Sequence, residues 1–102
     1  MARVEVTSHD SGAAIEISIA GSADIAAAAL LRERLLAVLT PERDVVVRLD
    51  ALDRLDGAGV QLLLAAHALV QRAGRSFHIS APGDVARRAI ETAGATALLA
   101  PE

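Results

Sequence analysis

Cysteine, lysine and tryptophan are missing from this 102-residue chain, and Phe77 is its single aromatic side chain. Without cysteine there can be no disulfide, no thiolate metal ligand and no catalytic thiol. Ten arginines stand against thirteen acidic residues, which gives a formal net charge of −3. A protein that binds nucleic acid usually carries a basic surplus, and one that binds single strands adds stacking aromatics. The chain has neither feature, so we expect no nucleic-acid partner.

Long hydrophobic runs are also missing, although 53% of the residues are hydrophobic. Charged or polar residues, such as those at 32–34 and His67, interrupt the apolar stretches before they reach the roughly 20 residues of a membrane span. The segment from Met1 to Ser11 becomes polar too early for the apolar region of a signal peptide. We therefore expect a cytoplasmic domain that does not insert into a membrane.

The apolar residues that are present predict four strands. Residues 4–6 and 15–19 alternate apolar with polar side chains, as half-buried strands do. Turn-forming residues at 8–12 lie between them and predict an antiparallel hairpin. The apolar run at 45–49 is typical of a buried strand in a parallel or mixed sheet, and residues 76–80 predict a further short strand.

Three segments have the periodicity of amphipathic helices. They run from about Ile25 to Leu39, from Gly59 to Ala73, and from the turn at 81–84 to Ala93; a last short turn or helix is predicted at 95–100. A hairpin followed by alternating helices and strands indicates an α/β fold. We predict one domain over residues 1–102, with a mixed sheet of four to five strands and helices packed mainly on one face.

The turn before the second helix is the most informative segment of the chain. After Asp50 we expect a short acidic loop that leads into the helix, with Asp56 as its N-cap. The backbone N–H groups at Gly57 and Ala58 then present the positive end of the helix dipole. In a regulatory protein, such a turn is a natural binding place for a phosphoryl group or for an acidic side chain of a partner.

The order of these elements and the residues at their turns resemble the STAS domain of anti-sigma factor antagonists. Residues 21–24 (Gly-Ser-Ala-Asp) resemble the family's Gly-x-Leu-Asp, and the strand at 45–50 and the turn at 72–75 also fit. Residues 55–60 (Leu-Asp-Gly-Ala-Gly-Val) stand where the family has Ile-Asp-Ser-Ser-Gly-Leu or Asp-Thr-Ala-Gly-Leu. The resemblance covers nearly the whole chain in order and spacing.

In that family, a partner kinase phosphorylates a hydroxyl residue of this turn, and the unphosphorylated form binds the kinase and frees a sigma factor. Here Ala58 occupies the usual serine position, and Gly57 stands where threonine or serine often occurs. The resemblance therefore implies a binding module whose phosphorylation switch is absent at this turn. We expect a non-enzymatic regulator that binds a kinase-type anti-sigma factor or a related signalling partner.

The helix after the turn offers the clearest partner surface. At about 100° per residue, Leu63 lies on the arc that faces the sheet, whereas Val60, Leu64 and His67 lie on another face. Val60 and Leu64 would form an apolar docking ridge, although the same pattern fits a ridge covered by a neighbouring helix. The predicted partner-binding residues are Asp24, Asp56, Gly57, Ala58, Gly59, Val60, Leu64 and His67.

Other kinds of site fit the sequence less well. The glycines at 57 and 59 form half of a dinucleotide fingerprint, but Leu62 replaces its third glycine. Asp50, Asp53 and Asp56 lack the spacing of a calcium loop, and the three histidines lack the spacing of zinc ligands. No serine lies in a hydrolase nucleophile motif. We therefore expect no catalytic residue, no metal and no cofactor.

Two further functions stay open on the sequence. One is the STAS subunit that regulates the ATPase of a phospholipid-trafficking ABC transporter, and the other is a chemotaxis-linked STAS adaptor. In each case the partner is a protein, either an anti-sigma factor or kinase or an ABC ATPase. A weak homodimer is also compatible with the sequence.

Overall fold

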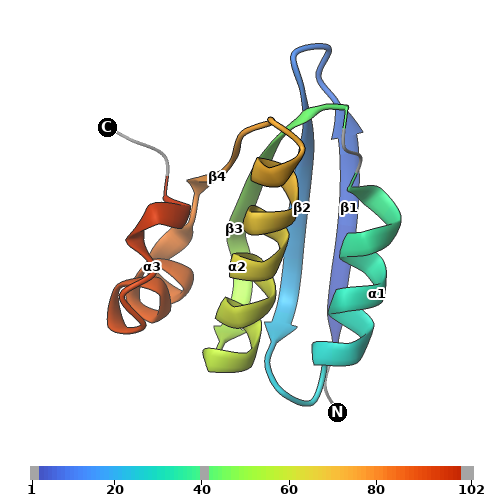
Figure 1. Ribbon diagram of the computed structural model, residues 1–102. Coiled ribbons are helices and arrows are strands. Elements are labelled where there is room, and N and C mark those ends of the chain that lie inside the picture. The colour runs from blue at the N-terminus through green and yellow to red at the C-terminus, as the bar shows by residue number, and fades with distance from the viewer. Residues whose placement is uncertain (1–2, 40–41, 100–102) are drawn as a thin grey trace.

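The computed structural model describes residues 3–39 and 42–99, in which strands and helices alternate after an opening hairpin (Figure 1). The strands are Val4–Asp10 (β1), Ala14–Ala23 (β2), Asp44–Leu55 (β3) and Phe77–Ala81 (β4). The helices are Ala28–Val38 (α1), Gly57–Arg72 (α2) and Gly83–Thr92 (α3), with a final 3-10 turn at Thr96–Leu98 (η1). No helix in these ranges is long and apolar enough to cross a membrane.

The four strands form one mixed sheet in the order β1-β2-β3-β4. The hairpin strands β1 and β2 are antiparallel, whereas β2 with β3 and β3 with β4 are parallel pairs. Each parallel pair needs a crossover connection, which α1 and α2 provide. Val45 lies opposite both Ile15 and Phe77, which fixes the register at the start of β3. The predicted fold class is confirmed.

Helices α1 and α2 lie side by side over one face of the sheet, and the core lies between these two layers (Figure 1). Among the described residues, no polar or charged side chain is buried. Burial of this aliphatic core, with Phe77 as its one aromatic member, is the main force that holds the layers together. The most deeply buried side chains include Ile17, Ile19, Leu31, Val47, Leu49, Val60, Leu63, Ile79, Ile90 and Leu98.

Strand β3 has different neighbours along its two halves. Strand β4 pairs only with residues from Val45 to Arg48 of β3. Helix α3 packs beside the rest of β3, so closely that a Cβ on Gly83 would lie 3.0 Å from the Cα of Asp50. On the far side of β4, Leu99 forms an isolated parallel bridge with Ile79. Helix α3 thus lies beside the part of β3 that extends beyond its pairing with β4.

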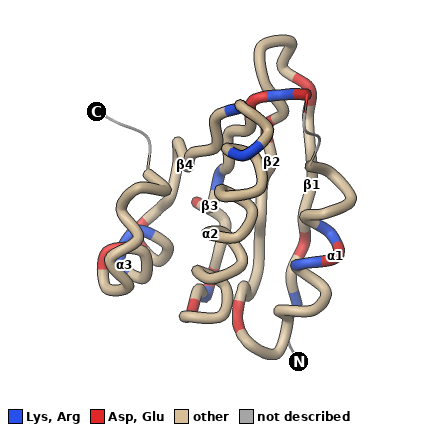
Figure 2. The backbone as a smooth tube through the Cα atoms, in the orientation of Figure 1, with Lys and Arg blue, Asp and Glu red and all other residues tan. Residues whose placement is uncertain are grey.

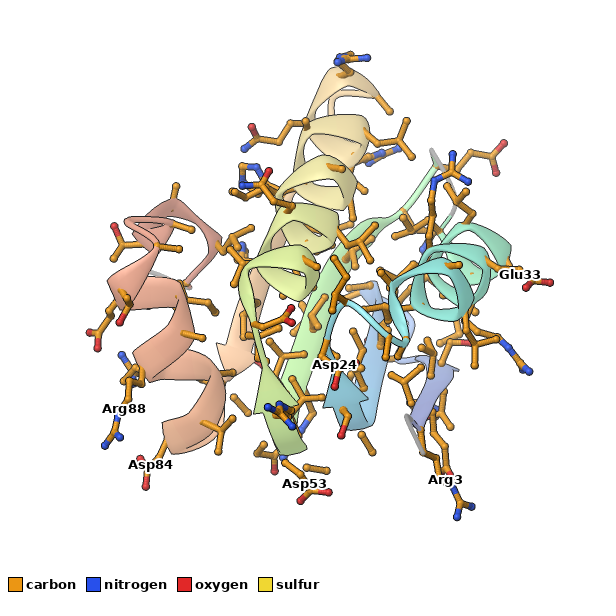
Figure 3. All side chains as sticks on the ribbon, turned by 90° about the horizontal axis from the view of Figure 1, so that it is seen from below. Arg3, Asp24, Glu33, Asp53, Asp84 and Arg88 are labelled. Atoms are coloured by element: carbon orange, nitrogen blue, oxygen red, sulfur yellow. The ribbon has the colours of Figure 1, made fainter. Side chains whose placement is uncertain are left out.

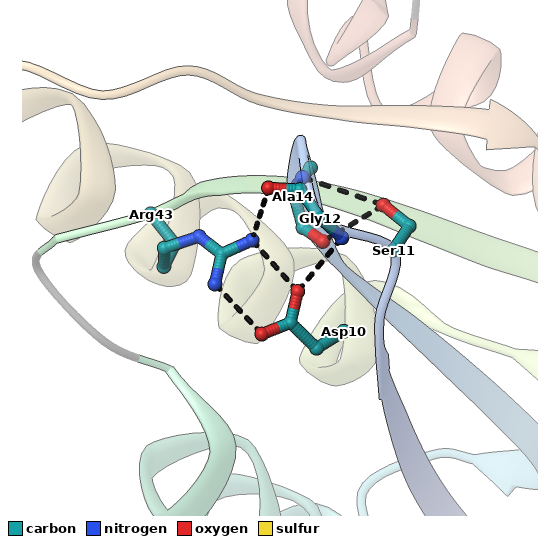
Figure 4. Close-up of polar contacts among 5 residues, drawn as sticks. All are labelled: Asp10, Ser11, Gly12, Ala14 and Arg43. Carbon is teal, nitrogen blue, oxygen red and sulfur yellow. Dashed lines mark hydrogen bonds and ion pairs between the residues drawn. The ribbon is translucent and has the colours of Figure 1, made fainter.

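A charged clamp fastens the β1–β2 hairpin to the start of β3 (Figure 4). Arg43 donates through both terminal nitrogens to the two carboxylate oxygens of Asp10, each over 2.8 Å, and to the carbonyl of Gly12 over 2.9 Å. Within the hairpin turn, the Ser11 hydroxyl donates to the carbonyl of Ala14 over 2.9 Å. The bidentate geometry suits a guanidinium and a carboxylate.

Two predicted boundaries are wrong. Helix α1 begins at Ala28, not at Ile25, because Asp24 holds residues 25–27 in a turn by accepting from the Ala27 N–H at 3.1 Å. Strand β3 continues to Leu55, so the expected acidic loop after Asp50 is part of the strand. Its pairing with β2 extends as far as Ala23 opposite Leu55 and satisfies the backbone of these residues.

The remaining predicted elements agree with the structure to within a few residues. The hairpin is present, but residues 8–10 of its predicted turn belong to β1. Strand β4 and helix α3 lie within two residues of their predicted positions. The turn η1 falls within the predicted segment 95–100, of which residue 100 lies outside the described residues. Helix α2 begins at Gly57, two residues before the predicted start at Gly59. The helical turn therefore includes both residues that stand where the family has hydroxyl side chains.

Candidate functional site

Asp56 links two loops at the N-terminal end of α2. It follows β3 directly, and its Oδ1 accepts from the Gly59 N–H over 3.1 Å, as an N-cap does. Its Oδ2 accepts from the backbone N–H of Ile25 over 3.0 Å. The predicted cap is confirmed, and the second bond fixes the loop after β2 against the turn before α2.

The pKa of the Asp56 carboxyl is lowered from its ordinary value by these bonds. Desolvation acts in the opposite direction, and it is the largest single influence on the group. The N–H groups of Gly59, Ile25 and Ala58, together with the charge of Arg54, more than offset it. Asp56 is therefore an ionised capping group at neutral pH, and its oxygens are turned toward backbone donors.

Gly59 holds the first turn of α2 close to the end of β2. A Cβ at this position would overlap the carbonyl oxygen of Ala23 and the side chain of Leu55. Gly59 is buried, and Val60 is 1% exposed. Both pack inward and fix the position of the turn, and this burial does not favour the prediction that they contact a partner.

Gly57 and Ala58 form the accessible part of this turn. Gly57 is exposed and a Cβ there would meet nothing within 4 Å, while Ala58 is half-buried. The turn therefore presents the backbone of Gly57 and part of one methyl group to the surface. Neither residue has a side-chain oxygen that could accept a phosphoryl group.

A cleft of about 400 Å³ separates this turn from α3. Asp56 and Gly57 form one side, and α3 forms the other with Val85, which is 41% exposed, and Thr92. Arg88 also contributes to the lining, and its guanidinium points outward from α3 (Figure 3). The cleft thus has a mainly apolar lining and lies next to the capped N-terminal end of α2.

Ile25 lies on the other side of the turn and is 77% exposed, the highest value among the large hydrophobic residues described. The sequence pattern does not indicate this exposure, because it places Ile25 in the first turn of an amphipathic helix. Asp24, directly before it, lies between the sheet and α1 near the same end of α2 (Figure 3). The structure thus brings Asp24, Ile25, Asp56, Gly57 and Ala58 together.

Leu64 and His67 lie away from this turn and do not form the predicted exposed ridge. Leu64 is half-buried and packs against the core. His67 is also half-buried, and its ring meets Phe77 edge to face with the centroids 5.8 Å apart. Together with the burial of Val60, these contacts favour the covered-ridge interpretation.

No group of three or more histidine, aspartate or glutamate side chains in the described ranges could hold a metal ion. Asp50 and Asp53 point into solvent from β3, and Asp56 is engaged with backbone N–H groups.

A comparison with known protein families assigns the chain to one of them. The family model described as "Mlab, STAS domain" matches residues 6–100. The chain therefore belongs to the STAS domain family, as the order of its elements and its turn residues predicted.

Two solved structures have the same fold. The first is an anti-sigma factor antagonist from Mycobacterium paratuberculosis, with a TM-score of 0.82 and 22% identity over 95% of this chain and 83% of that chain. The second is the anti-sigma factor antagonist SpoIIAA in its unphosphorylated form, with a TM-score of 0.72 and 14% identity over 94% of this chain and 86% of that chain. No curated protein sequence matches this chain significantly.

Proposed function

We propose that this STAS domain is a non-enzymatic regulator of the anti-sigma factor antagonist type. It binds a kinase-type anti-sigma factor, or a related signalling protein of the cytoplasm, through the surface around the α2 turn. We call this the switch-turn surface and define it by Ile25, Gly57, Ala58 and Val85. The observation that carries the proposal is the open turn with an exposed apolar side chain on each side. The two solved structures named above are described as anti-sigma factor antagonists.

The same proposal excludes control by phosphorylation at this turn. Gly57 and Ala58 lack an acceptor oxygen, and the oxygens of Asp56 accept hydrogen bonds from Gly59 and Ile25. Binding would then be regulated by the amount of the protein or of its partner. Incubation with the partner kinase and labelled ATP tests this point, since stoichiometric phosphate anywhere from Asp50 to Gln61 would contradict it.

A charge at position 58 is the sharpest test of the switch-turn surface. Ala58→Asp places an anion at a helix N-terminus, where the dipole stabilises it by roughly 0.3–1 kcal/mol. The same charge becomes unfavourable when a partner removes it from water. We expect normal melting by circular dichroism and lost partner binding by calorimetry. Unchanged melting with affinity within about threefold of wild type, a difference of about 0.65 kcal/mol, would place the contact elsewhere.

A second candidate is the STAS subunit that regulates the ATPase of a phospholipid-trafficking ABC transporter. The absence of a hydroxyl at Gly57 and Ala58 favours it, because a permanent subunit needs no phosphorylation switch. Affinity purification from the native cell, with wild type and Ala58→Asp side by side, distinguishes the two. An anti-sigma kinase lost in the variant supports the first candidate, whereas an ABC ATPase lost in the variant supports the second.

A further inference from the structure

A second apolar surface lies on the outer side of the helical layer, away from the switch-turn surface. It is a groove of about 170 Å³ between α1 and α2. Leu35 and Leu36 of α1 line it together with Leu39, the C-cap of that helix, and Leu62 and Leu69 line it from α2. We call it the α1–α2 groove. Its volume is close to the roughly 150 Å³ of an apolar cavity that holds a benzene molecule, which is enough for one large side chain.

Two leucines of this groove are about half exposed to solvent. Leu36 is 48% exposed and Leu69 is 47% exposed. They come from different helices and line the same groove, so they form a patch instead of two scattered surface residues. A contiguous apolar patch framed by polar residues marks an interaction site more often than an isolated exposed leucine does.

Among the residues that line the groove, the one charged side chain, Arg32, is basic. Arg72 follows Leu69 by one helical turn at the end of α2. The one acidic residue of α1, Glu33, points away from α2 (Figure 3), and α2 contains no acidic residue from Gly57 to Arg72. Figure 2 shows how the charged residues are distributed, with a long uncharged stretch of α2 below the arginines at its C-terminal end.

We propose that the α1–α2 groove binds an amphipathic helix of a protein partner whose apolar stripe is flanked by acidic residues. A large apolar side chain of that helix inserts between Leu36 and Leu69, and its carboxylates face Arg32 and Arg72. A second copy of this chain fits less well, because self-association would bring two basic rims together. The inference is independent of the switch-turn surface, which lies at the other end of α2 from Arg72.

The probe for this proposal is a pair of synthetic helical peptides. Both carry leucines at positions i, i+3, i+4 and i+7, the spacing of a helix bound in a groove, and they differ only in having glutamates or lysines beside that stripe. We expect the glutamate peptide to bind at least about tenfold more tightly, a difference of about 1.4 kcal/mol. In a backbone amide NMR titration, the shifted signals should belong to residues around Leu36 and Leu69.

Matched variants test whether the peptide contacts the residues of the groove. Leu36→Ser and Leu69→Ser should each weaken the glutamate peptide by about tenfold. Leu30→Ser should not, because Leu30 is exposed on α1 but does not line the groove. Arg32→Glu should shift the preference toward the lysine peptide. Circular dichroism melts identify any variant that fails to fold. Leu36→Ser and Leu69→Ser, each at an exposed position of a different helix, are two independent tests of the groove.

Three results would overturn the proposal. The first is equal binding of the two peptides, which would remove the charge preference. The second is a set of NMR shifts confined to the switch-turn surface. The third is a concentration-dependent dimer in analytical ultracentrifugation that Leu69→Ser abolishes, which would make a second copy of this chain the occupant.

Discussion

The backbone N–H of Ile25 donates to Oδ2 of Asp56 over 3.0 Å and joins positions 31 residues apart in the sequence. One carboxylate thus caps α2 and also holds the loop that carries the most exposed apolar side chain of the proposed interface. The fold of the turn and the presentation of Ile25 depend on the same residue.

Replacement of Asp56 tests this double role. Asp56→Ala should lower the free energy of unfolding by about 0.5–2 kcal/mol, as the loss of an N-cap does, with a further loss from the freed Ile25 N–H. Urea denaturation measures the change. Asp53→Ala is the matched control, because Asp53 is an exposed residue of β3 and does not cap a helix. Equal effects of the two substitutions would contradict the capping role.

The two glycines of the turn should respond oppositely to the same substitution. Gly59→Ala forces a methyl group against Ala23 and Leu55, and such overpacking costs typically about 1–3 kcal/mol. Gly57→Ala meets nothing and should be neutral or stabilise the protein by up to about 1 kcal/mol. Thermal or urea unfolding of both variants gives the comparison. If both stabilise the protein, α2 does not contact β2 as closely as described.

Ile25 should matter for binding and hardly for folding. Its side chain is 77% exposed, so Ile25→Ser should change stability by no more than about 0.5 kcal/mol. If it anchors the switch-turn surface, affinity for the co-purified partner should fall by about tenfold. Calorimetry measures the affinity, with Leu30→Ser as an equally apolar-to-polar control. A normal affinity of Ile25→Ser would remove this residue from the interface.

The Asp10–Arg43 clamp predicts how stability changes in acid. The hydrogen bond from Arg43, helped by the Gly12 N–H, lowers the pKa of Asp10 from 3.8 to about 2. A carboxyl with a lowered pKa in the folded state stabilises the protein above its unfolded-state pKa, and this stabilisation is lost as the pH falls through the folded-state pKa. Wild type should therefore lose the contribution of the clamp between about pH 4 and pH 2.

The variant Arg43→Gln separates this contribution from general acid effects. Its melting temperature should fall less steeply than that of wild type over the same pH window. Arg3→Gln is a suitable control, because its partner Glu5 and Arg3 itself are both highly exposed. Parallel pH profiles of wild type and Arg43→Gln would show that the clamp does not shift the titration of Asp10.

Local patterns were sufficient to predict most of the fold. The alternation at 15–19, the turn-forming residues between the first two strands and the Asp56 cap each act over a few residues. The predicted strand, hairpin and cap are confirmed, although the turn is shorter than predicted because residues 8–10 belong to β1. The second half of β3 was missed because Asp50, Asp53 and Arg54 give it the composition of a loop. Its extended backbone depends on pairing with β2, a long-range contact that composition does not reveal.

The rotation of α2 was predicted in part. Leu63 faces the sheet as the periodicity indicated, whereas Val60, expected on another face, is also buried. Three consecutive leucines, Leu62 to Leu64, did not fix the buried face closely enough to show this. Contact of Gly59 with the end of β2 selects it, and Leu63, Ala66 and Val70 then face inward on the same side of the helix. This rotation turns Leu69 outward, buries Val60, and so replaces the predicted ridge by the α1–α2 groove.

The arrangement at the two ends of the sheet limits how the protein can associate through its strands. At one end, α3 lies beside the second half of β3, and Leu99 bridges the outer side of β4. At the other end, β1 has β2 as its one strand neighbour in the described sheet. In the described residues, the β1 edge is therefore the more open of the two for strand addition. Pairing through β1 would end with two molecules, so this route cannot extend into a fibre.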